Sequence, residues 1–559
     1  ECKRVSSLPP EQQRSDWHGI EASLYAVRSV SRYIADEESK VLPFVMDLIP
    51  RLPPDVPQLR HTASLAVGKY ALWLDSHATY LQPLMPYLAQ GLSIPQCASA
   101  SATAIKELCE CCNKQMSLGD PVLQLYDGII AAQQLQQAGA PNNGGQFVLS
   151  LRDELEVLEG ACKAVSRLLL DQATAGQPDS TPTYLNRLVQ PVGTRLAAIA
   201  STEGNFGPKQ ATAEVERLTV IVRYLDLPRA TKGAGATAAA ATGGPKLSAR
   251  ATFIMDLMSE SWNLLDAISQ KYPHDIHLAE KLCRLHKHVM RGCGRSAYRP
   301  LLESLCAQLV RNFDTSRLSP YLYAASICIS EYGQDTSAVP LLFKMLTDMS
   351  TAVFGLLRTP GDFTAHPDVV EEFFFLTGRM MSYCPEPLVA SPLLGSLLEC
   401  AEVGMKLDHR DANSGTLNFL ENTISFGLRL KNRGGADPNQ NAYKDALEKA
   451  IVREGQKVVY NLASALRGDL PLYRLDNDRG SIAGVLFKLN ELCPGLLMQW
   501  LDSALMHVPG QAKSIFLQSL MDKVSRDEFD SSVRQFTSVC ERTRKLGGVS
   551  QALSAQHAT

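Results

Sequence analysis

This chain of 559 residues lacks both a strong charge imbalance and a long apolar run. Lys and Arg together number 55 and Asp and Glu 58, so the formal net charge is only -3. General nucleic-acid binders usually carry a large excess of Lys and Arg, so we expect no direct nucleic-acid partner. No apolar run reaches the roughly 18–20 residues that a membrane helix requires, so we also expect no membrane partner. The first residue is Glu and no signal-peptide pattern follows; we expect a piece of a longer protein.

The short motifs of common enzymes are also missing. The sequence contains no G-x-x-x-x-G-K-[ST], H-E-x-x-H or G-x-S-x-G pattern. The tripeptide HRD at 409–411 resembles part of a kinase catalytic loop, but no Gly-rich loop, Val-Ala-Ile-Lys strand or Asp-Phe-Gly accompanies it. Asp408, Arg410 and Asp411 fit better as capping residues at a helix start. We predict that the chain is not an enzyme and binds no cofactor.

The 14 cysteines lack the spacing of a metal site. Cys109, Cys111 and Cys112 form the densest cluster, but a zinc site needs a second Cys or His pair at ligand spacing, and none lies nearby. Most other cysteines lie inside apolar helical patterns and are expected to be small buried side chains in a reducing compartment. We therefore predict no bound metal.

Alternating strand patterns are absent, and almost every segment has helical periodicity. Apolar residues recur at i, i+3, i+4 and i+7 over 16–36, and a second helix follows at 38–53. Residues 57–77 and 78–93 form the next pair. Pairs recur about every 40 residues, which is the period of HEAT repeats. The sequence therefore predicts an all-α fold: an α-solenoid of HEAT-type antiparallel helix pairs that forms a superhelix.

Two segments interrupt this pattern. Residues 138–146 have the composition of a flexible joint, and the Gly/Ala-rich residues 230–249 have that of a disordered insertion. The last clear helical pattern covers 527–546. We predict one continuous solenoid over 1–548, followed by a polar C-terminal tail at 549–559.

One short helix, AEKLCRLHKHVMRGCGR at 279–295, concentrates cations on one side. At 100° per residue its basic residues share one sector, with Lys287 at the flank of that sector: Lys281, Arg284, Lys287, His288 and Arg291. Apolar residues occupy the other side: Leu282, Leu285, Val289 and Met290. No acid is interleaved at i+4 to neutralise the basic side.

This arrangement has two interpretations. A polyanionic partner would relieve the repulsion between the cations, and arginine suits bidentate contact with phosphate or carboxylate. Alternatively, the basic side is a solvated helix face, or its cations pair with acids from neighbouring repeats. The spacing alone leaves both open.

Several stretches along the chain carry a resemblance to a known family: DWHGIEASLYAVRSVSRYI, VGKYALWLDSHATYLQPLMPYLAQGL, CRLHKHVMR, LDHRDANSGTLNFLENTISFG and VCERTRKLGGVSQAL. In order and spacing they resemble the transportin-SR receptors of the importin-β superfamily, especially the plant-type members. The resemblance covers nearly the whole chain apart from the two Gly/Ala-rich segments.

The resemblance implies a nuclear import receptor that shuttles between nucleus and cytoplasm and interacts with nucleoporins. It implies that phosphorylated RS segments of serine/arginine-rich splicing factors bind to an arginine-rich helix, and that RanGTP releases them. By motif position, Arg284 and Arg291 match family arginines, Lys287 stands where the family has Arg or Lys, and Lys281 matches a more variable basic position. His288 is added from helix geometry alone.

The chain departs from the family pattern at its N-terminal end. Full-length members begin with further repeats that carry most of the RanGTP-binding surface, and those repeats are missing here, so RanGTP-dependent release is expected only of the full-length protein. An importin-13-like receptor with other cargo is one alternative. A HEAT-repeat scaffold that transports nothing is another. The acids Glu371 and Glu372 are candidates for binding the arginines of an RS segment, although outward-facing solvated positions are the preferred interpretation.

Overall fold

The computed structural model describes residues 17–112, 118–137, 149–201, 206–228, 248–433, 438–469, 472–522 and 524–556. Every regular element in these ranges is a helix and none is a strand, so the all-α prediction is confirmed. The predicted joint at 138–146 and nearly all of the predicted insertion at 230–249 lie outside the described residues.

The chain divides into two compact units, and each is described by itself. Unit 1 comprises Glu1–Tyr272 and Arg284–Tyr298, and unit 2 comprises Pro273–Cys283 and Arg299–Thr559. The division runs through one helix, α14 (Ile276–Cys293), between Cys283 and Arg284.

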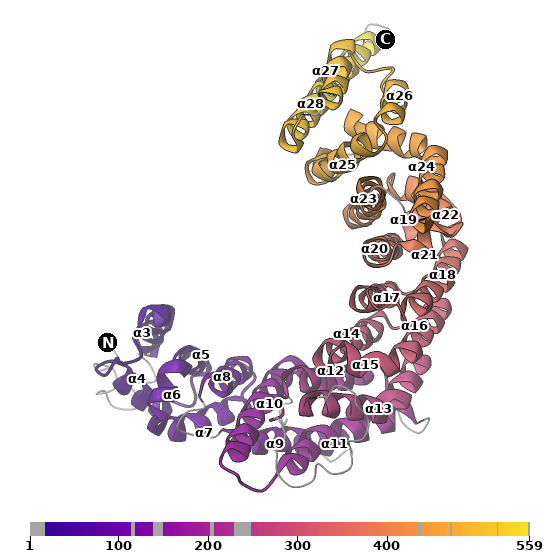
Figure 1. Ribbon diagram of the computed structural model, residues 1–559. Helices are drawn as coiled ribbons and strands as arrows, with labels where there is room; N and C mark the ends of the chain where they lie inside the picture. Colours follow the sequence, from indigo (N-terminus) through magenta and orange to yellow (C-terminus); the bar gives the residue numbers. More distant parts are fainter. Residues whose placement is uncertain are drawn as a thin grey trace. The chain divides into compact units, whose positions relative to one another are not determined.

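Unit 1 is built from two layers of helices (Figure 1). In the first layer each helix packs on the next: α3 (Trp17–Ser29), α5 (Pro57–Lys69), α8 (Ala98–Cys111), α10 (Leu151–Thr174) and α12 (Pro208–Tyr224). The second layer covers the first: α4 (Leu42–Leu48), α7 (Leu81–Gly91), α9 (Gly119–Gln137), α11 (Thr181–Ala200) and α13 (Ala249–Lys271). Short helices join the layers: η1 (Ser31–Tyr33), η2 (Ile49–Arg51), α6 (Ala71–Ser76), η3 (Ala78–Tyr80) and α15 (Arg295–Tyr298).

Small residues allow the first-layer helices of unit 1 to approach closely. A Cβ atom at Gly68 of α5 would lie only 3.0 Å from the Cα of Ala104 on α8. Ala100 and Ala102 of α8 are also buried. Because this contact would be tighter than most real Cβ contacts, a larger residue at position 68 would require α5 and α8 to shift apart slightly.

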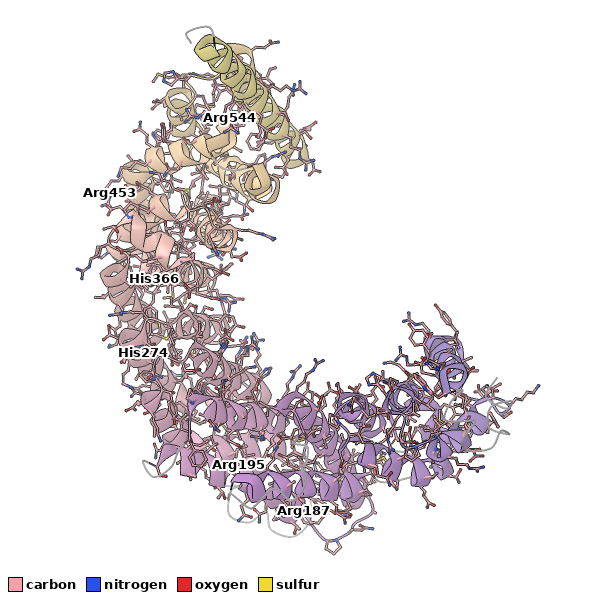
Figure 2. All side chains as sticks on the ribbon, turned by 180° about the vertical axis from the view of Figure 1, so that it is seen from behind. Arg187, Arg195, His274, His366, Arg453 and Arg544 are labelled. Atoms are coloured by element: carbon pink, nitrogen blue, oxygen red, sulfur yellow. The ribbon has the colours of Figure 1, made fainter. Side chains whose placement is uncertain are left out.

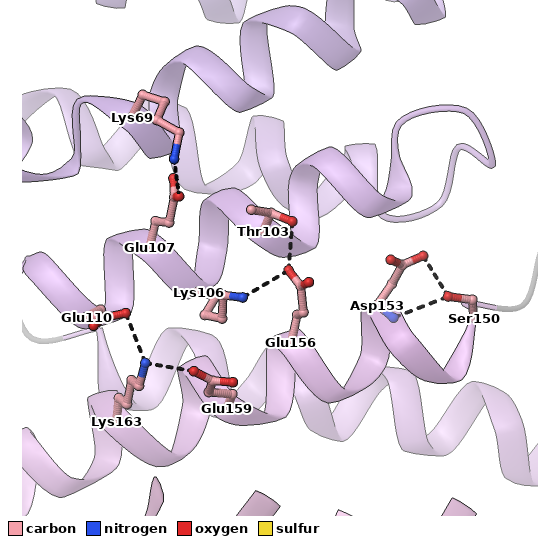
Figure 3. A network of polar contacts seen from close by, with 10 residues as sticks. All are labelled: Lys69, Thr103, Lys106, Glu107, Glu110, Ser150, Asp153, Glu156, Glu159 and Lys163. Carbon is pink, nitrogen blue, oxygen red and sulfur yellow. Dashed lines mark hydrogen bonds and ion pairs between the residues drawn. The ribbon is translucent and has the colours of Figure 1, made fainter. Parts of the chain in front are cut away.

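Ion pairs also link neighbouring helices of unit 1. Figure 3 shows those along the first layer: Lys69–Glu107 at 2.8 Å, Lys106–Glu156 at 3.4 Å and Lys163–Glu110 at 2.9 Å. In the second layer, Nη2 of Arg187 on α11 lies 2.5 Å from Asp127 on α9, and Arg187 is labelled in Figure 2. Half-exposed pairs of this kind contribute little stability each, about 0–1 kcal/mol, but they neutralise the lysines of this surface.

Unit 2 repeats the two-layer arrangement (Figure 1). Its first layer is a row of five helices: α17 (Ser319–Tyr332), α20 (Pro367–Tyr383), α23 (Arg410–Arg433), α25 (Leu472–Leu492) and α28 (Arg526–Gln556). The other long helices pack against this row: α16 (Leu302–Ser316), α18 (Val339–Leu356), α22 (Leu393–Gly404), α24 (Pro438–Ser464), α26 (Pro494–Ala504) and α27 (Gly510–Met521). Short elements connect them: η4 (Arg299–Leu301), α19 (Pro360–Ala365), α21 (Glu386–Val389) and η5 (Ala465–Asp469). These repeated helix pairs are those of a HEAT-type solenoid.

Helix α18 is long and apolar enough to pass a test for a membrane span by length and composition, with a mean hydropathy of 1.3 over 18 residues. The helix packs on α16, α17 and α20, and Leu342, Leu346 and Met349 are fully buried. It also carries a charged pair, Lys344 and Asp348, at 2.6 Å. These contacts assign α18 to the helical core of unit 2.

Several predicted helix boundaries are wrong. The helix predicted over 16–36 ends at Ser29, and the one predicted over 57–77 breaks at Tyr70 into α5 and α6. The Tyr70 hydroxyl donates a hydrogen bond of 2.6 Å to the carbonyl of Val27 near the end of α3, which ties the two helix ends together. The last helix does not end at 546, because α28 continues into the predicted polar tail as far as Gln556.

Candidate functional site: the basic face of α14

Helix α14 is amphipathic in the way that its spacing predicts. Arg284 and Arg291 are exposed, and Lys281, Lys287 and His288 are half-buried. We call these five residues the basic face. The opposite side of the helix is buried in the protein: Leu282, Cys283, Leu285, His286, Val289 and Met290. Lys281 belongs to unit 2, and the other four members of the basic face belong to unit 1.

The two histidines of the sequence HKH have opposite environments. The His286 ring packs edge-on against Trp262 at a centroid distance of 5.4 Å, and its Nδ1 lies 3.4 Å from the hydroxyl of Tyr298. Burial lowers the pKa of His286 to about 4. His286 is therefore neutral at physiological pH and anchors α14 in unit 1, whereas His288 lies on the basic face.

His288 lies among cations. Burial is the largest cause that lowers its pKa, and the charges of Arg223, Lys287, Arg291 and Arg284 lower it further. The imidazole is therefore mostly uncharged at neutral pH. An anion bound beside it would oppose these cations and raise its pKa.

Arg223 is the residue of this site that sequence reasoning missed. It is exposed at the C-terminal end of α12, a helix far from α14 in the sequence. Its charge acts on His288 more strongly than those of the three cations on α14 itself. The periodicity within one helix gives no signal for such a neighbour, so only the folded arrangement of unit 1 reveals it.

The members of the basic face differ in their contacts. Lys281, Lys287 and Arg291 each have a polar or electrostatic interaction within the protein. Arg284, by contrast, makes no hydrogen bond or ion pair with the described residues and is exposed. Unlike Lys69 and Lys163 of the first layer of unit 1, which have acid partners (Figure 3), Arg284 is left available to an external anion.

The two acids that were expected to be solvated are only partly so. Glu371 and Glu372 are half-buried on α20 of unit 2. Burial and the neighbouring acid Glu371 raise the pKa of Glu372 to about 7. Burial and Asp411 raise the pKa of Glu371. The solvated interpretation is therefore wrong for Glu372, which is partly protonated at neutral pH.

The HRD tripeptide has a structural role. Helix α23 begins at Arg410, and Nδ1 of His409 lies 3.3 Å from the backbone nitrogen of Ala412. The side-chain amide of the buried Asn413 donates to the carbonyls of Gly404, Met405 and Leu407 in the preceding turn. His409 and Asn413 thus supply hydrogen bonds at this helix start, and neither was among the residues predicted to cap it.

The cysteine clusters do not form a metal site in the part of the chain that the structure describes, where no group of three or more His, Cys, Asp or Glu could hold an ion. Burial raises the pKa of the Cys109 thiol to about 12. The Cys112 thiol lies 3.2 Å from the carbonyl of Ala71. Both thiols are buried among packed side chains.

Comparison with known proteins agrees with this architecture. Residues 39–124 match the family model described as the third TPR domain of transportin-3 and importin-13, and residues 254–357 match the fourth. The chain is thus similar to transportin-3 and importin-13 in two separate segments. The match to the fourth domain, over residues 254–357, includes the whole of α14.

Relatives match along almost the whole chain. Transportin MOS14 of Arabidopsis thaliana is 24% identical over 551 residues, covering 96% of this chain and 52% of the relative. Importin-13 of Mus musculus is 19% identical over 561 residues, covering 95% and 52%. A solved structure of importin-13 in its cytosolic state superimposes with a TM-score of 0.71 at 19% identity, covering 95% of this chain and 56% of that one. The chain spans about half the length of the curated relatives it matches.

Proposed function

We propose that this chain is the cargo-binding part of a nuclear import receptor, and that the basic face of α14 binds phosphorylated RS segments of serine/arginine-rich splicing factors. The observation that carries the proposal is the exposed guanidinium of Arg284, which has no acid partner among the described residues, beside Arg291 and His288. Similarity to domains of transportin-3 and importin-13 supports the transport role. The resemblance of CRLHKHVMR to the arginine-rich helix supports the cargo class.

The chemistry of the partner fits the basic face. A phosphoserine carries about -1.5 to -2 charges and three acceptor oxygens. Arginine presents a planar fork that holds two of these oxygens at once, while lysine offers only a point charge. Arg284 and Arg291 therefore select phosphate by geometry, and Lys281 and Lys287 add attraction. The contact weakens with salt, because exposed charges are screened over about 8–10 Å at physiological ionic strength.

The remaining partners belong to the full-length protein. We propose that RanGTP releases the cargo in the nucleus through repeats that precede this chain in its relatives, and that the receptor binds nucleoporins as it passes between cytoplasm and nucleus. The chain itself performs no catalysis under this proposal. A receptor of the importin-13 type with other cargo would use the same fold without a preference for phosphorylated RS segments, and a HEAT scaffold would show neither shuttling nor RS binding.

Binding of a fluorescent RS-repeat peptide, phosphorylated and unphosphorylated, tests the proposal. We expect salt-sensitive binding that prefers the phosphorylated peptide and that weakens at least thirtyfold in an Arg284→Ala/Arg291→Ala double variant. A hydrogen bond to a charged group contributes about 1.5–3 kcal/mol, so the loss of a single contact of about 2 kcal/mol already weakens binding about thirtyfold. Lys209→Ala/Lys344→Ala removes two exposed cations outside α14 and is the charge-matched control. Equal affinity in the two double variants, or equal affinity for both peptides, would reject the proposal.

A further inference from the structure

The C-terminal end of α12 adds a cation to the surroundings of the basic face. Arg223 lies in the last turn of α12, and its side chain is exposed. The guanidinium lies over the ring of the adjacent Tyr224, 4.9 Å from the centroid. Among the described residues this guanidinium has no hydrogen bond or ion pair, and the exposed carboxylate of Asp226 does not pair with it. The N–H groups of Arg223 are therefore available to an external anion.

Helix α13 connects the end of α12 to the end of α14. Nη2 of Arg250 donates hydrogen bonds to the carbonyls of Val222 and Arg223, at 3.3 and 3.1 Å. One turn further along α13, Cδ1 of Ile254 would lie only 3.1 Å from a Cβ atom at Gly292 of α14. Arg223 and the last turn of α14 are thus both held by the first two turns of α13, and all of these residues belong to unit 1.

His288 on the basic face is close to the cations of both helices. Burial is the largest cause that lowers its pKa, and the charge of Arg223 comes next, ahead of the three cations on α14 itself. The interaction between charges weakens with distance, so this order agrees with the attachment of both helices to α13. The cationic surface therefore continues from the basic face of α14 onto the end of α12.

We propose that Arg223, with His288 beside it, forms a second phosphate subsite next to the arginines of α14, so that one RS segment binds through two phosphoserines at once. The inference rests on the proposed function and extends it from one phosphate to two. Phosphoserines that alternate with arginine recur every second residue, which is about 6.5–7 Å in an extended chain. Along α14, His288 is about 4.5–6 Å from Arg284 and Arg291, so neighbouring phosphates can reach both subsites.

The chemistry of the second subsite suits a phosphate dianion. The guanidinium of Arg223 covers an aromatic ring with its face, and its N–H groups at the edge remain able to hold two phosphate oxygens. The uncharged imidazole of His288 can donate one further hydrogen bond. A bound dianion would also relieve the repulsion between Arg223 and the cations of α14, which no acid relieves at Arg223 itself.

Two RS peptides of identical sequence test the inference on the full chain, one with a single phosphoserine and one with two phosphoserines two residues apart. We expect the parent protein to bind the doubly phosphorylated peptide about tenfold more tightly, as an added charge-assisted contact implies. Arg223→Gln should remove most of this gain, and it should weaken binding of the singly phosphorylated peptide less than about threefold. Fluorescence anisotropy measures the four affinities.

Arg152→Gln is the matched control. Arg152 is another exposed arginine of the first layer of unit 1, at the start of α10. It lies 14 residues, or about 21 Å of helix, before Ser166, whose hydroxyl accepts a hydrogen bond from the backbone of Asp226 beyond the end of α12. Arg152 is therefore at the far end of its helix from Arg223, and Arg152→Gln should keep the full gain from the second phosphate.

The proximity of Arg223 to His288 is measured without any ligand. An NMR titration of the His288 imidazole, assigned by the loss of its signal in His288→Asn, should show a higher pKa in Arg223→Gln and an unchanged pKa in Arg152→Gln. An unchanged pKa in Arg223→Gln would overturn the inference.

The binding data can reject the inference and the proposed function separately. No gain from the second phosphate in the parent protein, or the same gain in Arg223→Gln and Arg152→Gln, would overturn the second subsite alone. The proposed function fails instead if Arg284→Ala/Arg291→Ala binds the singly phosphorylated peptide as tightly as the parent protein does. Circular dichroism of each variant confirms that its helices are intact.

Discussion

The guanidinium of Arg217 donates two hydrogen bonds of 2.6 Å each to the carboxylate of Glu154, from Nε to Oε1 and from Nη2 to Oε2. Arg217 lies on α12 and Glu154 on α10, and their exposed fractions are 6% and 0%. Nη1 of Arg217 also lies 2.6 Å from Glu214, which in turn pairs with Arg195 of α11 at 2.9 Å; Arg195 is labelled in Figure 2. A buried ion network thus joins three helices from both layers of unit 1.

Removing one partner of this network should destabilise unit 1 strongly. Arg217→Ala leaves Glu154 buried without its cation, and breaking a buried pair in this way typically costs about 3–5 kcal/mol. Glu154→Ala should cost a similar amount, and the double variant should cost clearly less than the sum of the two. Thermal unfolding of the four proteins in a double-mutant cycle measures this coupling.

The matched control is the exposed pair of Arg167 and Asp171 on α10, which are 45% and 46% exposed. Its cycle should give about 0.5 kcal/mol or less. A coupling energy for Arg217 and Glu154 no larger than that of the control pair would contradict the structural role of the network.

His286 should make stability depend on pH. Its pKa in the folded protein is about 4, below the value of about 6.5 for an unfolded histidine. As pH falls, the unfolded chain takes up the proton first, so stability is complete above about pH 6.5 and is lost progressively toward pH 4. Between pH 7.5 and 5.5 this loss is on the order of 1 kcal/mol.

Replacing His286 with Phe removes the proton-binding group and keeps an aromatic ring against Trp262. We therefore expect the Tm of His286→Phe to rise relative to that of the parent protein when both are moved from pH 7.5 to 5.5. His277→Phe replaces an exposed histidine in the first turn of the same helix and is the control. A Tm difference for His286→Phe that is the same at both pH values would refute the buried neutral state.

The helical periodicity of the sequence predicted the helix pairs well, because each helix buries one apolar stripe against its neighbours. The segments 57–77 and 78–93, predicted as one pair, are an example: they contain α5 and α7, which pack against each other. Periodicity also separated the buried residues of α14 from its basic face, since both follow from 100° per residue. Those features depend on residues that are close in the sequence.

Features that depend on residues distant in the sequence were missed. The hydrogen bond from Tyr70 to the carbonyl of Val27, at the break between α5 and α6, joins residues that are distant in the sequence. Arg217 and Glu154 look like surface charges in their own helices, and only their pairing makes burial tolerable. The charge of Arg223 on α12 likewise acts on His288 of α14, and the two residues are too far apart in the sequence for periodicity to relate them.

Glu372 should show the opposite pH dependence to His286. Its pKa in the folded protein is about 7, well above the ordinary value of 4.5. The folded protein therefore holds the proton more tightly, and stability falls as pH rises from about 4.5 to 7. The full penalty above pH 7 is on the order of 3 kcal/mol. Glu372→Gln should raise the Tm at pH 8 and change it little at pH 5.

The control for this prediction is Glu399→Gln, which alters a side chain that is 59% exposed on α22 of the same unit. It should leave the Tm nearly unchanged at both pH values. If Glu372→Gln shifts the Tm equally at pH 5 and pH 8, the carboxyl group is not protonated in the folded protein at the lower pH, and the buried environment of Glu372 is described wrongly.

Charge and geometry on the basic face can be separated by replacing arginine with lysine. Arg284→Lys/Arg291→Lys keeps both charges but loses the planar forks that hold two phosphate oxygens at once. We expect the affinity for a phosphorylated RS peptide to fall about tenfold, less than in the alanine double variant, while the dependence of log Kd on log salt concentration stays the same. Fluorescence anisotropy over a range of salt concentrations measures both quantities.

If the lysine variant binds as tightly as the parent protein, the basic face acts as a diffuse cationic surface, and specific recognition of phosphate by Arg284 and Arg291 is rejected. If the salt dependence falls together with the affinity, the substitution has changed the number of ionic contacts, and the comparison moves to the single variants Arg284→Lys and Arg291→Lys to find which contact was lost.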